Sequence, residues 1–160
     1  MGFGKDMIWG AATAAYQIEG GFNEDGKGLS VWDVFCEKPN VVKNGDSGRV
    51  ACDHYRRYRE DVRLLKEMGA KSYRFSVSWP RVLPNGTGEI NPAGIKFYND
   101  LIDELIANGI EPMLTLFHWD YPQALEDRGG WLNPDSPKWF AEYARVIAEN
   151  FGDRVKLYQG

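Results

Sequence analysis

The stretch Ser72–Ser78, SYRFSVS, alternates strictly between polar and apolar side chains. A period of two is typical of a β-strand, because successive side chains point to opposite faces of the sheet. One face would carry Tyr73, Phe75 and Val77, and the other Arg74, Ser76 and Ser78. We expect the apolar face to meet helices. A buried Arg74 would need a carboxylate partner, in a structural ion pair or at the floor of a site, because an unpaired buried charge is costly. Without such a partner it would stay hydrated or lie at an interface.

On both sides of this strand, the hydrophobic pattern alternates between strand-like and helix-like segments. Apolar residues recur every three to four positions in three segments, which predict helices near residues 55–68, 92–105 and 136–151. Short apolar runs predict further strands over residues 7–13, 111–117 and 155–160, whereas residues 22–50 look irregular. Such alternation predicts an α/β fold with a parallel sheet and helices outside it.

No linker or change of composition divides the chain, so we expect residues 1–160 to form a single unit without an internal boundary. The pattern leaves two architectures open. One is an open doubly wound sheet, and the other is a segment of an eight-stranded barrel.

Composition narrows the class of protein. With 43% hydrophobic and 26% charged residues, the 160-residue chain is typical of a globular protein, not a disordered or fibrous one. The net charge of −4 argues against a nucleic-acid partner, and no apolar run of about 18 residues indicates a membrane span. Residues 1–10 lack the pattern of a secretory signal, so the expected location is the cytoplasm.

Cofactor and metal signals are also missing from the sequence. Cys36 and Cys52 have no CxxC spacing, and His54 and His118 lie on different predicted elements. The Gly26-Lys27-Gly28 stretch is too short for a phosphate-binding loop. The sequence therefore indicates no metal and no cofactor.

Polar and aromatic side chains follow two of the predicted strands. Gln17 comes after the first strand, and His118-Trp119 come after the third. Carboxyl ends of parallel strands carry the sites of barrel enzymes. An amide, an imidazole and an indole face suit the hydroxyl groups and C–H faces of a sugar. Taken singly, however, His118 is more often a residue with an ordinary hydrogen bond, and Trp119 is more often part of a core.

Three longer motifs resemble glycoside hydrolase family 1, the β-glucosidase type. They are Met7–Gly21 (MIWGAATAAYQIEGG), Tyr73–Arg81 (YRFSVSWPR) and Leu116–Glu126 (LFHWDYPQALE). They occur in the family's order over nearly the whole chain. Met7, where Phe is usual, and Tyr121, where Leu is common, are small departures.

The resemblance implies about three and a half βα units from the N-terminal part of a (β/α)₈ TIM barrel. It also implies retaining hydrolysis of β-linked sugars, which uses two carboxyl groups. By match, Gln17 and His118 would bind sugar hydroxyls, Trp119 would border that subsite, and Arg74 would support the nucleophile. No catalytic residue would be present, because the acid/base Glu follows strand four and the nucleophile lies on strand seven, both beyond Gly160. The final residues, Lys156–Gly160, match the family's fourth strand poorly.

Three readings of the chain remain open. The first is a portion of a retaining β-glucosidase that is inactive alone. The second is a non-catalytic sugar-binding fragment, and the third is a partial barrel that assembles with itself. The expected partners are a β-glucoside or related sugar, and either a complementary C-terminal polypeptide or another copy of the chain.

Overall fold

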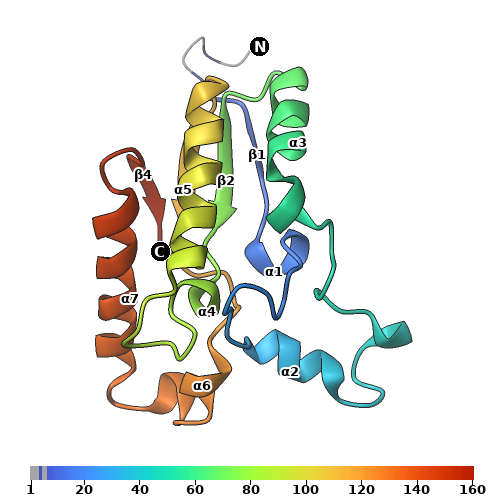
Figure 1. Ribbon diagram of the computed structural model, residues 1–160, viewed down its shortest axis with the longest axis vertical. Coiled ribbons are helices and arrows are strands. Elements are labelled where there is room, and N and C mark those ends of the chain that lie inside the picture. Colours follow the sequence, from blue (N-terminus) through green and yellow to red (C-terminus); the bar gives the residue numbers. More distant parts are fainter. Residues whose placement is uncertain (1–3, 5–6) are drawn as a thin grey trace.

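A computed structural model describes residue 4 and residues 7–160. Residues 1–3 and 5–6, part of the stretch without a signal pattern, lie outside the described residues. The fold centres on a four-stranded parallel sheet in the order β1-β2-β3-β4 (Figure 1). The strands are β1 (Gly10–Ala12), β2 (Ser72–Ser76), β3 (Glu111–Thr115) and β4 (Leu157–Gln159). Each predicted strand is therefore present, and each is shorter than the segment that predicted it.

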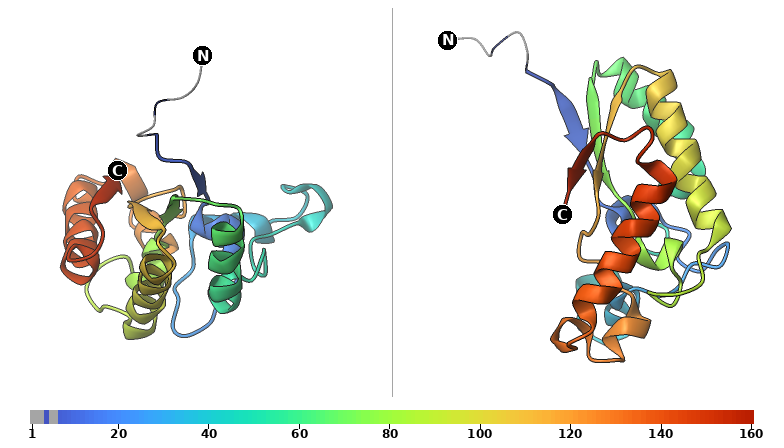
Figure 2. Two further views of the ribbon diagram at one scale, coloured as in Figure 1. Left: turned by 90° about the horizontal axis from the view of Figure 1, so that it is seen from above. Right: turned by 90° about the vertical axis from the view of Figure 1, so that its left-hand side faces the viewer.

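Three long helices cover one side of the sheet, as the periodicity predicted (Figure 2). They are α3 (His54–Glu67), α5 (Pro92–Ala107) and α7 (Ser136–Phe151). The start of α5 follows from its sequence, because Pro92 fits the first turn and the Asn91 side chain accepts a hydrogen bond from the Ala93 N–H at 3.2 Å. The short helices are α1 (Ala15–Ile18), α2 (Val31–Glu37), α4 (Trp79–Val82) and α6 (Gln123–Glu126), with 3₁₀ turns η1 (Lys43–Gly45) and η2 (Gly130–Leu132).

The expectation that residues 22–50 are irregular is wrong at α2. Ser30 and Asp33 form a reciprocal capping box at the start of this helix. The Ser30 hydroxyl also donates to the Asp33 carboxylate at 2.7 Å. The Ser-x-x-Asp spacing is visible in the sequence, but the surrounding glycines and asparagines hid a helix of only seven residues.

The register of β1 depends on a glycine. Gly10 lies opposite Ser72, and a Cβ at Gly10 would come within 2.3 Å of the Ser72 carbonyl oxygen. Only a residue without a side chain lets the two strands approach this closely. Gly10 therefore helps to set the position of the segment that follows β1.

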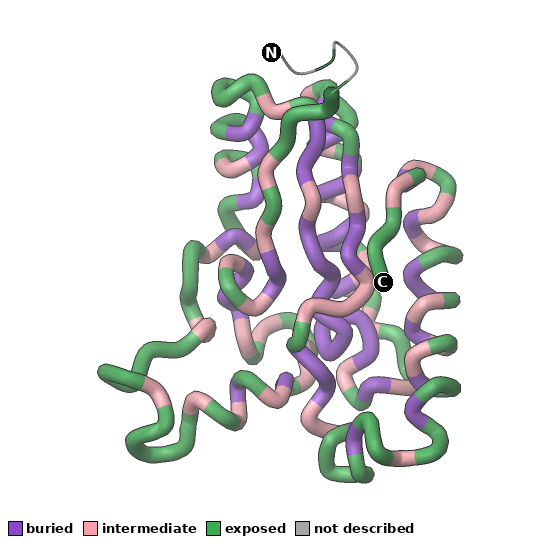
Figure 3. The backbone as a smooth tube through the Cα atoms, turned by 180° about the vertical axis from the view of Figure 1, so that it is seen from behind, coloured by how far each residue is buried: buried purple, intermediate pink, exposed green. Residues whose placement is uncertain are grey.

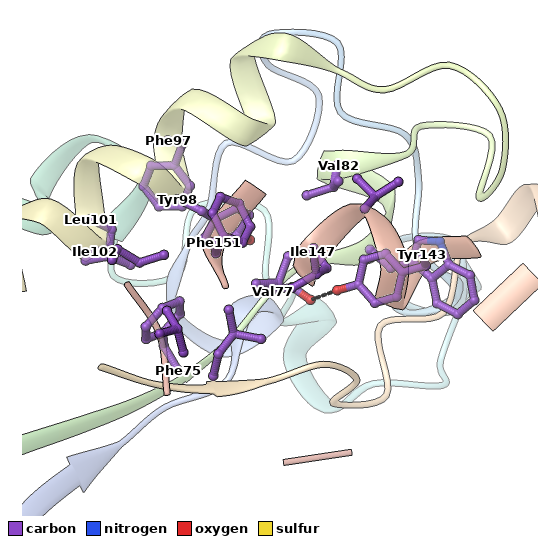
Figure 4. Close-up of a cluster of buried hydrophobic side chains, with 14 of the residues drawn as sticks. Phe75, Val77, Val82, Phe97, Tyr98, Leu101, Ile102, Tyr143, Ile147 and Phe151 are labelled. Atoms are coloured by element: carbon purple, nitrogen blue, oxygen red, sulfur yellow. Dashed lines mark hydrogen bonds between the residues drawn. The ribbon is translucent and has the colours of Figure 1, made fainter. Parts of the chain in front are cut away.

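The core lies between the sheet and the helices (Figure 4). Tyr73, Phe75 and Val77 all belong to it, so the predicted alternation is confirmed. Trp79 stacks on Tyr143 of α7, with ring centroids 4.6 Å apart and planes inclined by 10°. The Tyr143 hydroxyl donates to the carbonyl oxygens of Val77 at 3.2 Å and Leu116 at 2.8 Å. Helix α7 is thus tied to the chain just beyond β2 and β3.

Figure 3 views the sheet from the side opposite the three long helices. Arg74 alternates with the core residues Tyr73 and Phe75, so it lies on this side. Among the described residues Arg74 pairs with no carboxylate; its Nη1 donates to the side-chain amide oxygen of Gln159 on β4 at 2.9 Å. Arg74 is only half-buried here, so its charge keeps contact with water and a neutral acceptor suffices. Among residues 7–160, β1 pairs only with β2 and β4 only with β3, which leaves both edges of the sheet open.

Candidate functional site

The three residues predicted to bind a sugar line one open cavity. Gln17 lies on α1, directly after β1, and His118 and Trp119 lie in the loop after β3. The cavity has a volume of about 650 Å³. Neighbouring parallel strands end at the same edge of a sheet, which brings these distant parts of the chain together.

The three side chains are presented differently. Gln17 is exposed and His118 is half-buried, so both offer polar atoms to a ligand. Trp119 is 71% exposed, and its φ of +76° places a bulky residue in the left-handed region. The indole thus lies outside the core, where a lone tryptophan would usually pack, and its backbone conformation is uncommon for a bulky residue. Site residues are a common place for such strain.

Residues 16–51 form the other wall of the cavity, which the sequence did not reveal. Trp32 and Cys36 of α2 contribute to it. The Tyr16 hydroxyl lies 3.2 Å from the Trp32 carbonyl oxygen and 3.3 Å from Cys36 Sγ, and it accepts from the Gly48 N–H at 3.2 Å. Burial raises the pKa of the Tyr16 hydroxyl, which therefore stays neutral and able to donate. Tyr16 thus joins α1, α2 and the loop around Gly48.

A buried ion pair supports the segment that carries Gln17. Arg81 of α4 donates from Nε to Glu19 Oε2 at 2.9 Å, and the two side chains are 1% and 5% exposed. The Tyr98 hydroxyl donates to the other Glu19 oxygen and accepts from the Ser78 N–H at 2.7 Å. Glu19 and Arg81 both lie inside the quoted motifs, but nothing in the sequence showed that they meet.

The loop after β3 contains a second buried acid. Asp120 is 1% exposed, and neither carboxylate oxygen has a hydrogen-bond partner of normal geometry among the described residues. Burial, followed by the negative charge of Glu19, raises the pKa of the Asp120 carboxyl to about 7, although the Ser78 hydroxyl acts in the opposite direction. Asp120 is therefore largely protonated in mildly acidic solution.

Comparisons with known proteins agree with this arrangement. The profile of Glycosyl hydrolase family 1 matches residues 1–159. The chain belongs to this family. Beta-glucosidase A of Acetivibrio thermocellus is 56% identical over 156 residues, which are 98% of this chain and 35% of that protein. The 1,4-beta-D-glucan glucohydrolase of Thermotoga neapolitana is 55% identical over 96% of this chain and 36% of that protein.

The solved family 1 β-glucosidase from Thermotoga maritima has the same fold in this region. It superposes with a TM-score of 0.97 and 54% identity, over 99% of this chain and 36% of that structure. The chain thus spans about a third of the length of the relatives it matches. Its sheet and helices are the N-terminal part of the family 1 (β/α)₈ barrel, as the motifs indicated.

Cleavage by a family 1 protein needs two carboxyl groups at the sugar, about 5–5.5 Å apart when configuration is retained. Within residue 4 and residues 7–160, Asp46 is the one carboxylic acid that lines the cavity.

No group of three His, Cys, Asp or Glu side chains in the described part of the chain could hold a metal ion. Its helices are also too short or too polar to cross a bilayer.

Proposed function

We propose that this chain supplies part of the sugar-binding site of a family 1 β-glucosidase and does not itself carry the catalytic carboxyl groups. The observation that supports this proposal is the shared cavity of Gln17, His118 and Trp119, three residues from two separate motifs. Relatives named as β-glucosidases, and Thermotoga maritima structures in complex with deoxynojirimycin and castanospermine, support a β-glucoside or related sugar as the ligand.

Each of the three side chains has a role that its chemistry allows. The Gln17 amide can donate to one hydroxyl and accept from another, and His118 can do the same through its two ring nitrogens. The exposed Trp119 indole offers a flat apolar face for the C–H groups of a sugar ring. Arg74, held at the open face by Gln159, would be released to a carboxylate that a complementary polypeptide brings to the sheet.

The test is titration calorimetry of the full chain with methyl β-D-glucoside. We expect weak binding to the unaltered chain. Gln17→Ala and Trp119→Ala should each weaken it by about fivefold, since the loss of one hydrogen bond or one ring contact is worth roughly 1 kcal/mol. Gln123→Ala is the matched control, because this α6 glutamine donates a hydrogen bond to Asp127, just after the helix, and does not line the cavity. Equal binding by the three variants, or no binding by the unaltered chain, would contradict the proposal.

A further inference from the structure

Asp120 lies in a loop that keeps its carboxyl group out of water. It follows Trp119, whose backbone is left-handed, and precedes Tyr121, whose carbonyl oxygen accepts from the Val31 N–H at 2.8 Å. Tyr121 is thus tied to the start of α2. Asp120 is 1% exposed, and its carboxyl group lacks a hydrogen-bond partner of normal geometry in the described chain.

The charged groups that act on Asp120 are Glu19 and Lys27, and each already has a partner of opposite charge. Arg81 is paired with Glu19 at 2.9 Å. Lys27, whose side chain is 6% exposed, is paired with Asp33 at 3.1 Å. Asp120 and these two ion pairs form a cluster of three acids and two bases, in which Asp120 is the acid without a counter-ion.

The other groups that face Asp120 do not supply a positive charge. Tyr143 of α7 feels the charge of Asp120, and burial together with this charge raises the pKa of its hydroxyl, so it stays neutral. Ser78, after β2, offers only a hydroxyl. Glu19 offers a negative charge, and Tyr98 is occupied by Glu19 and the Ser78 N–H. The cluster is electrically balanced only when Asp120 carries its proton.

We propose that Asp120 is a positioning residue of the site. As a neutral acid it lets residues 118–121 pack against the segment around Glu19, and its ionisation displaces them. The displacement follows from electrostatics, because an ionised Asp120 is a buried, unpaired charge that also repels Glu19. The loop can relieve this cost by moving the carboxylate toward water. His118 and Trp119 move with it, so sugar binding weakens as pH rises. This last consequence rests on the proposed function.

The test follows Asp120 itself by NMR in the full chain between pH 5 and pH 9. We expect its side-chain carboxyl ¹³C signal to titrate with a midpoint near 7. The Trp119 backbone amide should shift with the same midpoint. In Asp120→Asn the Trp119 titration should vanish. It should persist in His118→Gln, which removes the neighbouring imidazole, and in Asp127→Asn, the exposed matched control.

A carboxyl signal that is already ionised at pH 5 would overturn the proposal. So would a Trp119 amide that ignores the Asp120 titration, or one that still titrates in Asp120→Asn. Calorimetry with methyl β-D-glucoside at pH 5.5 and pH 8.5 adds a functional measurement. Affinity should fall severalfold at the higher pH in the unaltered chain and stay constant in Asp120→Asn. If no sugar binds at either pH, the proposed function fails, and the NMR titration still decides the role of Asp120.

Discussion

Replacing Arg81 by methionine should strongly destabilise the chain. The substitution keeps much of the side-chain volume but removes the charge that pairs with Glu19 at 2.9 Å. Glu19, 4% exposed, would then keep only Tyr98 as a hydrogen-bond donor. Breaking a buried pair in this way costs about 3–5 kcal/mol, because it leaves an uncompensated charge out of water. That is a large share of the about 5–15 kcal/mol that stabilises a typical domain.

A double-mutant cycle separates the pair from ordinary packing. Glu19→Gln alone leaves the buried Arg81 guanidinium unpaired, whereas the double variant removes both charges. Its cost should fall short of the sum of the single costs by about 2–3 kcal/mol, the upper range of coupling for residues in contact. The assay is urea denaturation at pH 7, followed by circular dichroism.

The exposed helical pair Arg63–Glu67 provides the control. Its members are 59% and 57% exposed, so Arg63→Met should cost no more than about 0.5 kcal/mol. A cost below about 1 kcal/mol for Arg81→Met, or additive effects in the cycle, would refute the reasoning. The buried pair would then contribute no more than a surface pair.

Three further predictions follow from the same features. The pKa of Asp120 is about 7 in the folded chain and about 4 when unfolded, so the stability that its protonated form contributes is fully present below pH 4 and is lost as pH rises through 7. Over this range the free energy of unfolding should fall by up to about 4 kcal/mol. Urea titrations at several pH values should show this slope in the unaltered chain and not in Asp120→Asn. Light scattering over a tenfold dilution should show a mass that rises with concentration, because both sheet edges are open; a constant 18.2 kDa would contradict this. The chain alone should release no chromophore from an aryl β-glucoside above a buffer control, since one carboxyl lines the cavity; turnover that survives repurification would show that the carboxyl groups have been misassigned.

The sequence by itself determined the main elements and the family. Helices α3, α5 and α7 and the alternation of Tyr73, Arg74 and Phe75 appear as predicted, because the period of apolar residues is a local signal. The motifs around Gln17 and His118-Trp119 were sufficient to name the family because each is long and occurs in the family's order. Those signals depend only on neighbouring residues.

Only the tertiary structure decided which distant residues meet. Glu19 pairs with Arg81 across 62 positions, and Arg74 bonds to Gln159 across 85. The burial of Asp120 beside an exposed Trp119 could not be read from the sequence either, since both follow one strand in one motif. Partner choice and burial depend on how strands and helices pack, and the free energy of a charged group is set by the atoms around it, not by its neighbours along the chain.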